Sequence, residues 1–190
     1  MGAMLLEQDV EYFNPDEAAT QIRSANPGMT QTEANSAAWY EGKRLLERAI
    51  RERSDFAFET TLGGHTITAL LDSALAIGIE VRIWFVGLSN VELHIKRVRS
   101  RAERGGHTIP DETIRKRYDL SRYNLTQLLP KLTELRVFDN SEEADPHAGL
   151  PPEPKLILHL DRGQLVSLCD LTDAPEWAKP ILIEAMRLMA

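Results

Sequence analysis

The sequence has little cysteine and no long apolar run. Among its 190 residues is one cysteine, Cys169, which excludes an internal disulfide and is expected to be a small packing residue. No apolar run approaches the roughly 18 residues of a membrane span. The opening residues, "MGAMLLEQD", lack the basic start and apolar middle of a signal peptide. We therefore expect a cytoplasmic protein with no membrane partner.

Two common catalytic signatures are also absent. The five histidines do not fall at the spacing of metal ligands, so the sequence predicts no metal site of its own. No G-x-S-x-G motif occurs, which argues against a serine nucleophile on a strand-to-helix turn.

The charge of the chain is unevenly distributed. The net charge is −7, but residues 94–117 hold eight Lys and Arg against three Asp and Glu, so this segment carries +5 and the rest −12. An acidic protein with one basic segment favours a local anion site. The basic segment has no interleaved aromatic residues for base stacking, so we expect no nucleic-acid partner.

The order of apolar patterns predicts an α/β fold. Stretches typical of strands, at residues 10–14, 56–60, 80–88 and 135–141, alternate with helical patterns, and a hairpin turning at Asp161–Gly163 with a final helix follows. This alternation predicts one domain over residues 1–190 with a mainly parallel sheet, to which residues 151–190 add the hairpin and helix.

Three of the predicted strands end in polar side chains. These ends are residues 14–17, 59–61 and 139–141. Ligands of open α/β sheets bind at the carboxyl ends of strands, which favours a shared site. Each end alone also has a simple structural interpretation, as a helix-dipole partner, a solvated strand end or a turn.

The basic segment contains a cationic helix face. Arg97, Arg101 and Arg104 recur at helical spacing and precede Gly105-Gly106-His107, after which Arg115-Lys116-Arg117 forms a second cationic turn. A solvated helix face explains the first set equally well. Alternatively, two arginine-bearing helices around a glycine joint form a lid over a polyanion, because arginine forks match phosphate oxygens.

Several of these segments together resemble the zeta-toxin-like P-loop kinases. The resemblance covers residues 5 to 141 and rests on motifs in the family's order: "FNPDEAA", "FAFETTLGG", "FVGLSNVELHIKRVRSRAERGGHTIPDETIRKRYDLSRYNL" and "VFDNS". It implies a P-loop kinase-like, three-layer α/β/α fold with residues 94–117 as the lid. It also implies an ATP-dependent kinase, using Mg²⁺ bound to ATP, that phosphorylates a hydroxyl of a small substrate such as UDP-N-acetylglucosamine. The family's toxin–antitoxin systems add an antitoxin protein as a partner to consider.

The resemblance also implies roles for individual residues. Asp16 matches the carboxylate that receives the hydroxyl proton, and the end of the second strand matches the substrate site. The substrate residues are Glu59, Thr60 and Thr61. The remaining motif positions match residues that contact ATP in the family. They are Arg104 and His107 in the lid, Arg115 and Arg117 at the phosphates, and Asn140 at the adenine.

One element of that family is not in the sequence. No G-x-x-x-x-G-K-[ST] loop, which cradles phosphates with backbone N–H groups, occurs in the chain. We interpret "MGAMLLEQD" as the end of the helix that follows this loop, so the first strand, the loop and most of that helix are expected to be missing. Because that strand is central in the family's sheet, its loss is expected to open two inner strand edges. Three explanations of the missing loop stay open: a start codon placed too far downstream, a truncated record, or a true descendant without the loop.

Two hypotheses follow from the sequence. The first is an ATP-dependent small-molecule kinase, impaired in this chain without the phosphate loop. The second is a non-catalytic pseudokinase or binding module that keeps the substrate pocket and the arginine lid.

Overall fold

The computed structural model describes residues 10–103, 106, 108–142 and 153–189. The chain divides into two compact units, Met1–Thr61 and Leu62–Ala190. The division falls inside the "FAFETTLGG" segment, between Thr61 and Leu62. Each unit is described by itself below.

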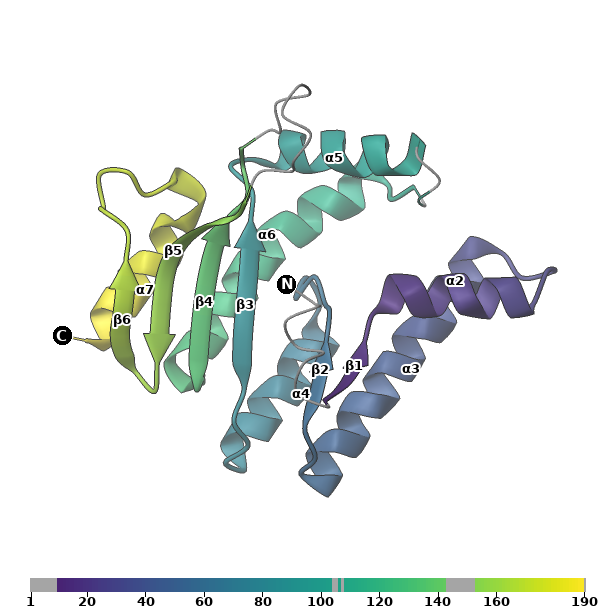
Figure 1. The fold of residues 1–190 in the computed structure, drawn as a ribbon, viewed down its shortest axis with the longest axis horizontal. Helices are drawn as coiled ribbons and strands as arrows, with labels where there is room; N and C mark the ends of the chain where they lie inside the picture. The colour runs from purple at the N-terminus through teal and green to yellow at the C-terminus, as the bar shows by residue number, and fades with distance from the viewer. Residues whose placement is uncertain (1–9, 104–105, 107, 143–152, 190) are drawn as a thin grey trace. The chain divides into compact units, whose positions relative to one another are not determined.

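The first unit is a β–α–α–β arrangement (Figure 1). Strand β1 (Glu11–Phe13) leads into helices α2 (Pro15–Ala25) and α3 (Gln31–Glu52), and the chain returns in strand β2 (Phe56–Phe58). The two strands pair in parallel, with Tyr12 opposite Ala57.

Local sequence signals explain where these helices begin. The Asn14 side chain accepts hydrogen bonds from the first turn of α2, and Pro15 occupies the first helical position. Thr30 and Glu33 form a capping box at the start of α3. Small residues then allow the two helices to pack closely, and the fully buried ones are Ala19, Ala34 and Ala38.

The second unit is built on a four-stranded mixed sheet of order β3-β4-β5-β6. Strands β3 (Arg82–Gly87) and β4 (Glu134–Asp139) are parallel. Strands β5 (Lys155–Asp161) and β6 (Gln164–Leu168) are the predicted hairpin, which continues the sheet in antiparallel fashion. The mixed α/β architecture is therefore confirmed, while the P-loop kinase fold remains a prediction.

Each sheet ends in strands with one open edge. In the described residues, β2 pairs with β1 alone and β3 pairs with β4 alone.

The hairpin turn follows from the backbone needs of its residues. Arg162 and Gly163 both have positive φ, at 47° and 74°. Two left-handed residues give the turn whose twist matches that of the flanking strands. The predicted turn at Asp161–Gly163 is thereby confirmed.

Six further helical elements complete this unit in the described part of the chain. They are α4 (His65–Ala76), α5 (Val91–Glu103), α6 (Asp111–Leu128) with the 3₁₀ turn η1 (Leu129–Lys131), and η2 (Glu176–Ala178) followed by α7 (Lys179–Leu188). In Figure 1, α6 and α7 lie behind the four-stranded sheet. The largest fully buried side chains come from these helices and from β4 and β5, and they are Leu125, Leu128, Leu135, Val137, Leu158, Ile181 and Leu182.

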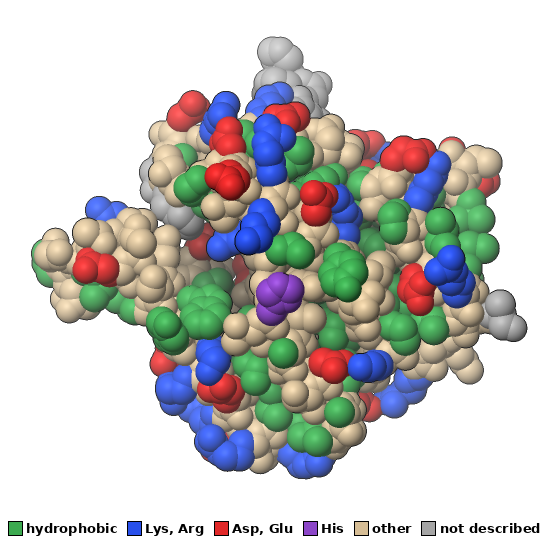
Figure 2. Space-filling model, turned by 180° about the vertical axis from the view of Figure 1, so that it is seen from behind, with side chains coloured by type: hydrophobic (Ala, Val, Ile, Leu, Met, Phe, Trp, Pro, Cys, Tyr) green, Lys and Arg blue, Asp and Glu red, His purple; other side chains and the backbone are tan. Residues whose placement is uncertain are grey.

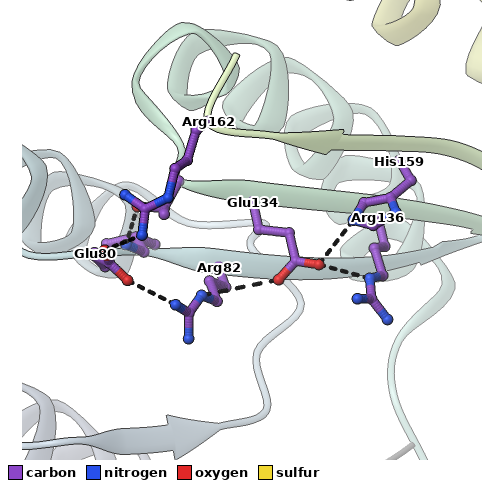
Figure 3. A network of polar contacts seen from close by, with 8 residues as sticks. Glu80, Arg82, Glu134, Arg136, His159 and Arg162 are labelled. Atoms are coloured by element: carbon purple, nitrogen blue, oxygen red, sulfur yellow. Dashed lines mark hydrogen bonds and ion pairs between the residues drawn. The ribbon is translucent and has the colours of Figure 1, made fainter. Parts of the chain in front are cut away.

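Charged side chains gather on the sheet in a network that Figure 3 shows from close by. The Glu134 carboxylate, 13% exposed, lies 2.7 Å from Arg136 Nε and 2.9 Å from His159 Nε2. Glu80 pairs with Arg82 at 2.7 Å and with Arg162 at 2.6 Å. These contacts join β3, β4, β5 and the hairpin turn.

The outer surface carries both charge signs. On the face drawn in Figure 2, Lys and Arg side chains are interspersed with Asp and Glu. None of the helices in the described residues combines the length and the apolar character that crossing a membrane requires.

Candidate functional site

In the first unit, the strand ends bring three polar side chains together. The Tyr12 hydroxyl donates to Glu59 Oε1 at 2.5 Å, and Asn14 Nδ2 donates to Glu59 Oε2 at 3.3 Å. Parallel pairing of β1 with β2 places these residues at the same edge, because their carboxyl ends lie side by side. Each oxygen of Glu59 therefore has a fixed donor, which orients the carboxylate.

Asn14 connects this carboxylate to the start of α2. Its Oδ1 accepts from the backbone N–H of Asp16 at 2.9 Å and of Glu17 at 3.2 Å. Asp16 is exposed in the first turn, where the helix dipole favours a negative charge. The structure thus places Asp16 and Glu59, two of the residues predicted from the sequence, on either side of one asparagine.

Burial and the neighbouring carboxylate change the pKa of Tyr12. Burial first, then the hydrogen bond to Glu59 and its negative charge, raise the pKa of Tyr12 from 10.0 to about 12. Tyr12 therefore remains a hydrogen-bond donor throughout the physiological pH range. Sequence reasoning missed it, because nothing in the local pattern "VEYFN" shows that its partner lies 47 residues away.

Thr60 and Thr61 follow Glu59, just beyond the end of β2, and both are exposed. They close the first unit. Leu62, at the start of the second unit, is 4% exposed and has a φ of 51°, which is uncommon for a residue other than glycine. Asn124 of α6 supports that backbone by donating to the Leu62 carbonyl oxygen at 2.7 Å.

In the second unit, the end of β4 is tied to α5. Arg97 Nη1 donates to the Asn140 carbonyl oxygen at 2.7 Å, and Arg97 Nη2 donates to the Glu142 carbonyl oxygen at 2.8 Å. The Asn140 N–H donates to the Gly87 carbonyl oxygen at 2.9 Å. Asn140 is thus held by its backbone between β3 and the basic helix.

The remaining predicted residues lie elsewhere. Arg115 pairs with Glu92 at 2.5 Å, which links α6 to α5. Arg117 packs against Gly63, where a Cβ would be 2.8 Å from Arg117 Cγ. Arg104 and His107, predicted for the lid, lie outside the described residues.

A cavity of about 300 Å³ lies in this unit between α5, α6 and the ends of β3 and β4. Arg97 and Arg101, which the sequence predicts on one helix face, both line it. The sequence analysis considered Arg97 and Arg101 for a lid over a polyanion, but it did not foresee Arg122 or Trp177 beside them. The helical spacing of Arg97 and Arg101 was the available signal, whereas Trp177 reaches the cavity from the far end of the chain.

Histidine and carboxylate side chains do not form a metal-binding cluster in the described part of the chain, where no group of three could hold an ion.

These features define a mixed α/β protein with a carboxylate site on a parallel strand pair and a basic cavity in its second unit. A Haemophilus influenzae protein, described as an uncharacterized protein, is 30% identical over 106 residues, which cover 56% of this chain and 73% of that protein. The chain belongs to the same family as this protein. No protein-family model and no solved structure matches the chain.

Proposed function

We propose that this protein is an ATP-dependent phosphotransferase that acts on a hydroxyl of a small polar substrate, of which a nucleotide sugar such as UDP-N-acetylglucosamine is the first to test. The observation that carries the proposal is the Tyr12–Glu59–Asn14 arrangement beside Asp16. The resemblance to zeta-toxin-like kinases supports the same function.

The first unit supplies the groups that this chemistry needs near the acceptor. Phosphoryl transfer to a hydroxyl requires a carboxylate that orients the hydroxyl and receives its proton. Asp16 takes this role, because it is an exposed carboxylate on a helix start that Asn14 fixes. Glu59 binds other substrate hydroxyls, since each carboxylate oxygen can accept a bond in addition to the one from Tyr12 or Asn14.

The resemblance assigns the contacts to the phosphates to other residues. By resemblance, Arg104, His107, Arg115, Arg117 and Asn140 would contact ATP, which carries Mg²⁺ and provides the phosphoryl group. Transferring phosphoryl oxygens need such neutralisation.

The decisive experiment compares two carboxylates in one helix turn. Asp16→Asn and Glu17→Gln each remove one negative charge from the first turn of α2, so their effects on the helix dipole are similar. We expect Asp16→Asn to lower phosphoryl transfer to nucleotide sugars by about 100-fold or more, as loss of a general base does. Glu17→Gln should stay within about twofold of the unaltered chain, because its carboxylate has no part in the proton transfer.

Transfer is measured as ADP release and as labelled product, with this chain and with the product of the same reading frame including any in-frame codons ahead of Met1. Equal rates in Asp16→Asn and the unaltered protein would refute the kinase. The kinase would also be refuted if neither this chain nor the product with the additional in-frame codons transferred phosphate to any acceptor tested.

A binding module is the second candidate, favoured by the absence of a G-x-x-x-x-G-K-[ST] loop from the sequence. It predicts that nucleotide sugars bind without ADP release. In either case, Glu59→Gln should weaken substrate binding by about tenfold, since a charge-assisted acceptor becomes a neutral amide.

A further inference from the structure

Helix α7 is apolar on two sides. Its inner side buries Ile181, Leu182 and Ala185 in the core of the second unit. On its outer side, Ile183 is 52% exposed and Met186 is also exposed. A helix that packs only against its own domain is typically polar on its outer side. The exposed apolar side chains of α7 therefore favour a contact with a partner.

The outer side of η2 and α7 carries a symmetric series of exposed side chains. They recur at i, i+4, i+7 and i+11, the spacing of one helix face, and they are Glu176, Pro180, Ile183 and Arg187. An acidic residue begins the series, two apolar residues form its centre, and a basic residue ends it. The spacing is the same from either end, while the charges at the two ends are opposite. We call these four residues the α7 face.

The charges at the two ends of the α7 face are accessible. The Glu176 side chain is 86% exposed and the Arg187 side chain is 73% exposed. Glu176 pairs with Lys179, and Arg187 pairs with Glu184 at 3.4 Å, in each case three residues away along the chain. Exposed pairs of this kind are weak, and a carboxylate or a guanidinium can bind a second partner in addition to the first.

We propose that the α7 face is the interface of a homodimer, in which a second copy of this chain docks with its own α7 antiparallel to the first. With a two-fold axis between Pro180 and Ile183, Glu176 lies opposite the partner's Arg187, and Pro180 lies opposite the partner's Ile183. The symmetry repeats both contacts, because a two-fold interface uses the same surface on each copy. A parallel arrangement would instead place like charges opposite one another.

The size of the α7 face predicts a weak dimer. Residues 176–188 of η2 and α7 form about 20 Å of helix. Stable interfaces bury about 800 Å² on each partner over roughly 20–30 residues, so a contact centred on one short helix is at the low end. We therefore expect a Kd of about 10–100 µM. The face lies wholly within the second unit and does not depend on the proposed kinase activity.

Sedimentation velocity of the full chain between about 1 and 500 µM tests the dimer. We expect the average mass to rise from that of one chain toward that of two chains over this range. A monomer at every concentration would overturn the proposal. Growth beyond two copies would overturn it as well, because a two-fold contact is closed once two copies have met.

Two charge reversals test the antiparallel order. Glu176→Arg and Arg187→Glu should each raise the Kd by about tenfold or more, because two attractive pairs become two repulsive ones in a symmetric dimer. An equal mixture of the two variants should dimerise with nearly the original Kd, since each variant supplies the charges that the other lacks. A mixture that associates no better than either variant alone would refute the antiparallel arrangement.

Two apolar substitutions locate the contact. Ile183→Ser removes an exposed apolar side chain from the centre of the face and should raise the Kd by about tenfold or more. Val166→Ser is the matched control, because Val166 is exposed to a similar degree, 58%, but belongs to β6, and its Kd should stay within about twofold. Circular dichroism checks that both variants are folded. Association that is lost in Val166→Ser but kept in Ile183→Ser would place the contact on the edge of β6 and overturn the proposal.

Discussion

The Trp177 indole lies against the backbone of Gly87 so closely that a Cβ at Gly87 would be 2.2 Å from its Cη2 atom. Glycine is therefore required at the end of β3, because Cβ atoms do not approach other heavy atoms within 3.0 Å. The contact joins η2, near the end of the chain, to the parallel strands, and it forms part of the wall of the cavity.

Gly87→Ala is expected to destabilise the protein by about 1–3 kcal/mol, because the indole must move out of a packed position. Urea unfolding and the near-ultraviolet circular dichroism of tryptophan measure this change. Gly28→Ala is the control, since a Cβ there meets nothing within 4 Å. Trp177→Leu should relieve most of the penalty in the double variant, and an unrelieved penalty would contradict the steric explanation.

Alkaline titration tests the contact between Tyr12 and Glu59. In the folded protein the pKa of Tyr12 is raised from 10.0 to about 12, so between these pH values the unfolded chain loses the phenol proton and the folded chain retains it. The free energy of unfolding contributed by Tyr12 is therefore complete below pH 10 and declines as the pH rises toward 12. Tyr12→Phe should show a shallower decline over this window, and Glu59→Gln should shift the 295 nm phenolate transition to lower pH. Identical slopes for Tyr12→Phe and the unaltered chain would show that Tyr12 is not perturbed.

Removal of the Glu134 carboxylate tests the network in Figure 3. Glu134→Ala leaves Arg136 and His159 without their shared acceptor in a largely buried position, and loss of hydrogen bonds to a charged group costs about 1.5–3 kcal/mol. Glu80→Ala should change the unfolding midpoint far less, because Glu80 is 47% exposed although it also contacts two arginines. Equal losses in both variants would mean that burial does not decide the strength of these contacts.

Asn124 is a buried polar residue, 3% exposed, in α6. Its Nδ2 donates to the carbonyl oxygens of Leu62 at 2.7 Å and Gly64 at 3.3 Å. Asn124→Leu keeps the branched shape of the side chain but removes the amide donor to the Leu62 carbonyl oxygen, which should cost about 1–3 kcal/mol in chemical denaturation. Thr126→Ala on the same helix is expected to stay within about 0.5 kcal/mol, because its hydroxyl bonds only to a helix carbonyl. A loss in Asn124→Leu no larger than that of Thr126→Ala would contradict the supporting role.

Local signals were sufficient for most of the secondary structure. Asn14, Thr30 and Asn90 each accept hydrogen bonds at a helix start, and asparagine and threonine favour that position in any fold. The C-terminal segment behaved differently from the prediction of one continuous helix. A 3₁₀ turn ends at Ala178, and α7 begins at Lys179 with Pro180 in its first turn. Proline lacks an N–H to donate, so a new helix starts there more readily than an old one continues.

The candidate sites were predictable only in part. Asp16 and Glu59 were found from their positions after strands, and parallel pairing brings the strand ends together. Tyr12 and Trp177 were not found, because their roles depend on partners 47 and 38 residues away. The local sequence around Tyr12 in β1 or around Trp177 in η2 does not indicate which distant residue the side chain will contact.

The sequence by itself determined the helix caps, the hairpin turn, the cationic face of α5 and the apolar alternation of the strands. These depend on neighbours within a few residues, whose backbone preferences and hydrogen bonds act in any context. Only the tertiary structure decided that Tyr12 orients Glu59, that Arg97 holds the end of β4, and that Trp177 requires glycine at position 87. These contacts arise when packing closes long loops, so they depend on which strands and helices become neighbours rather than on local sequence.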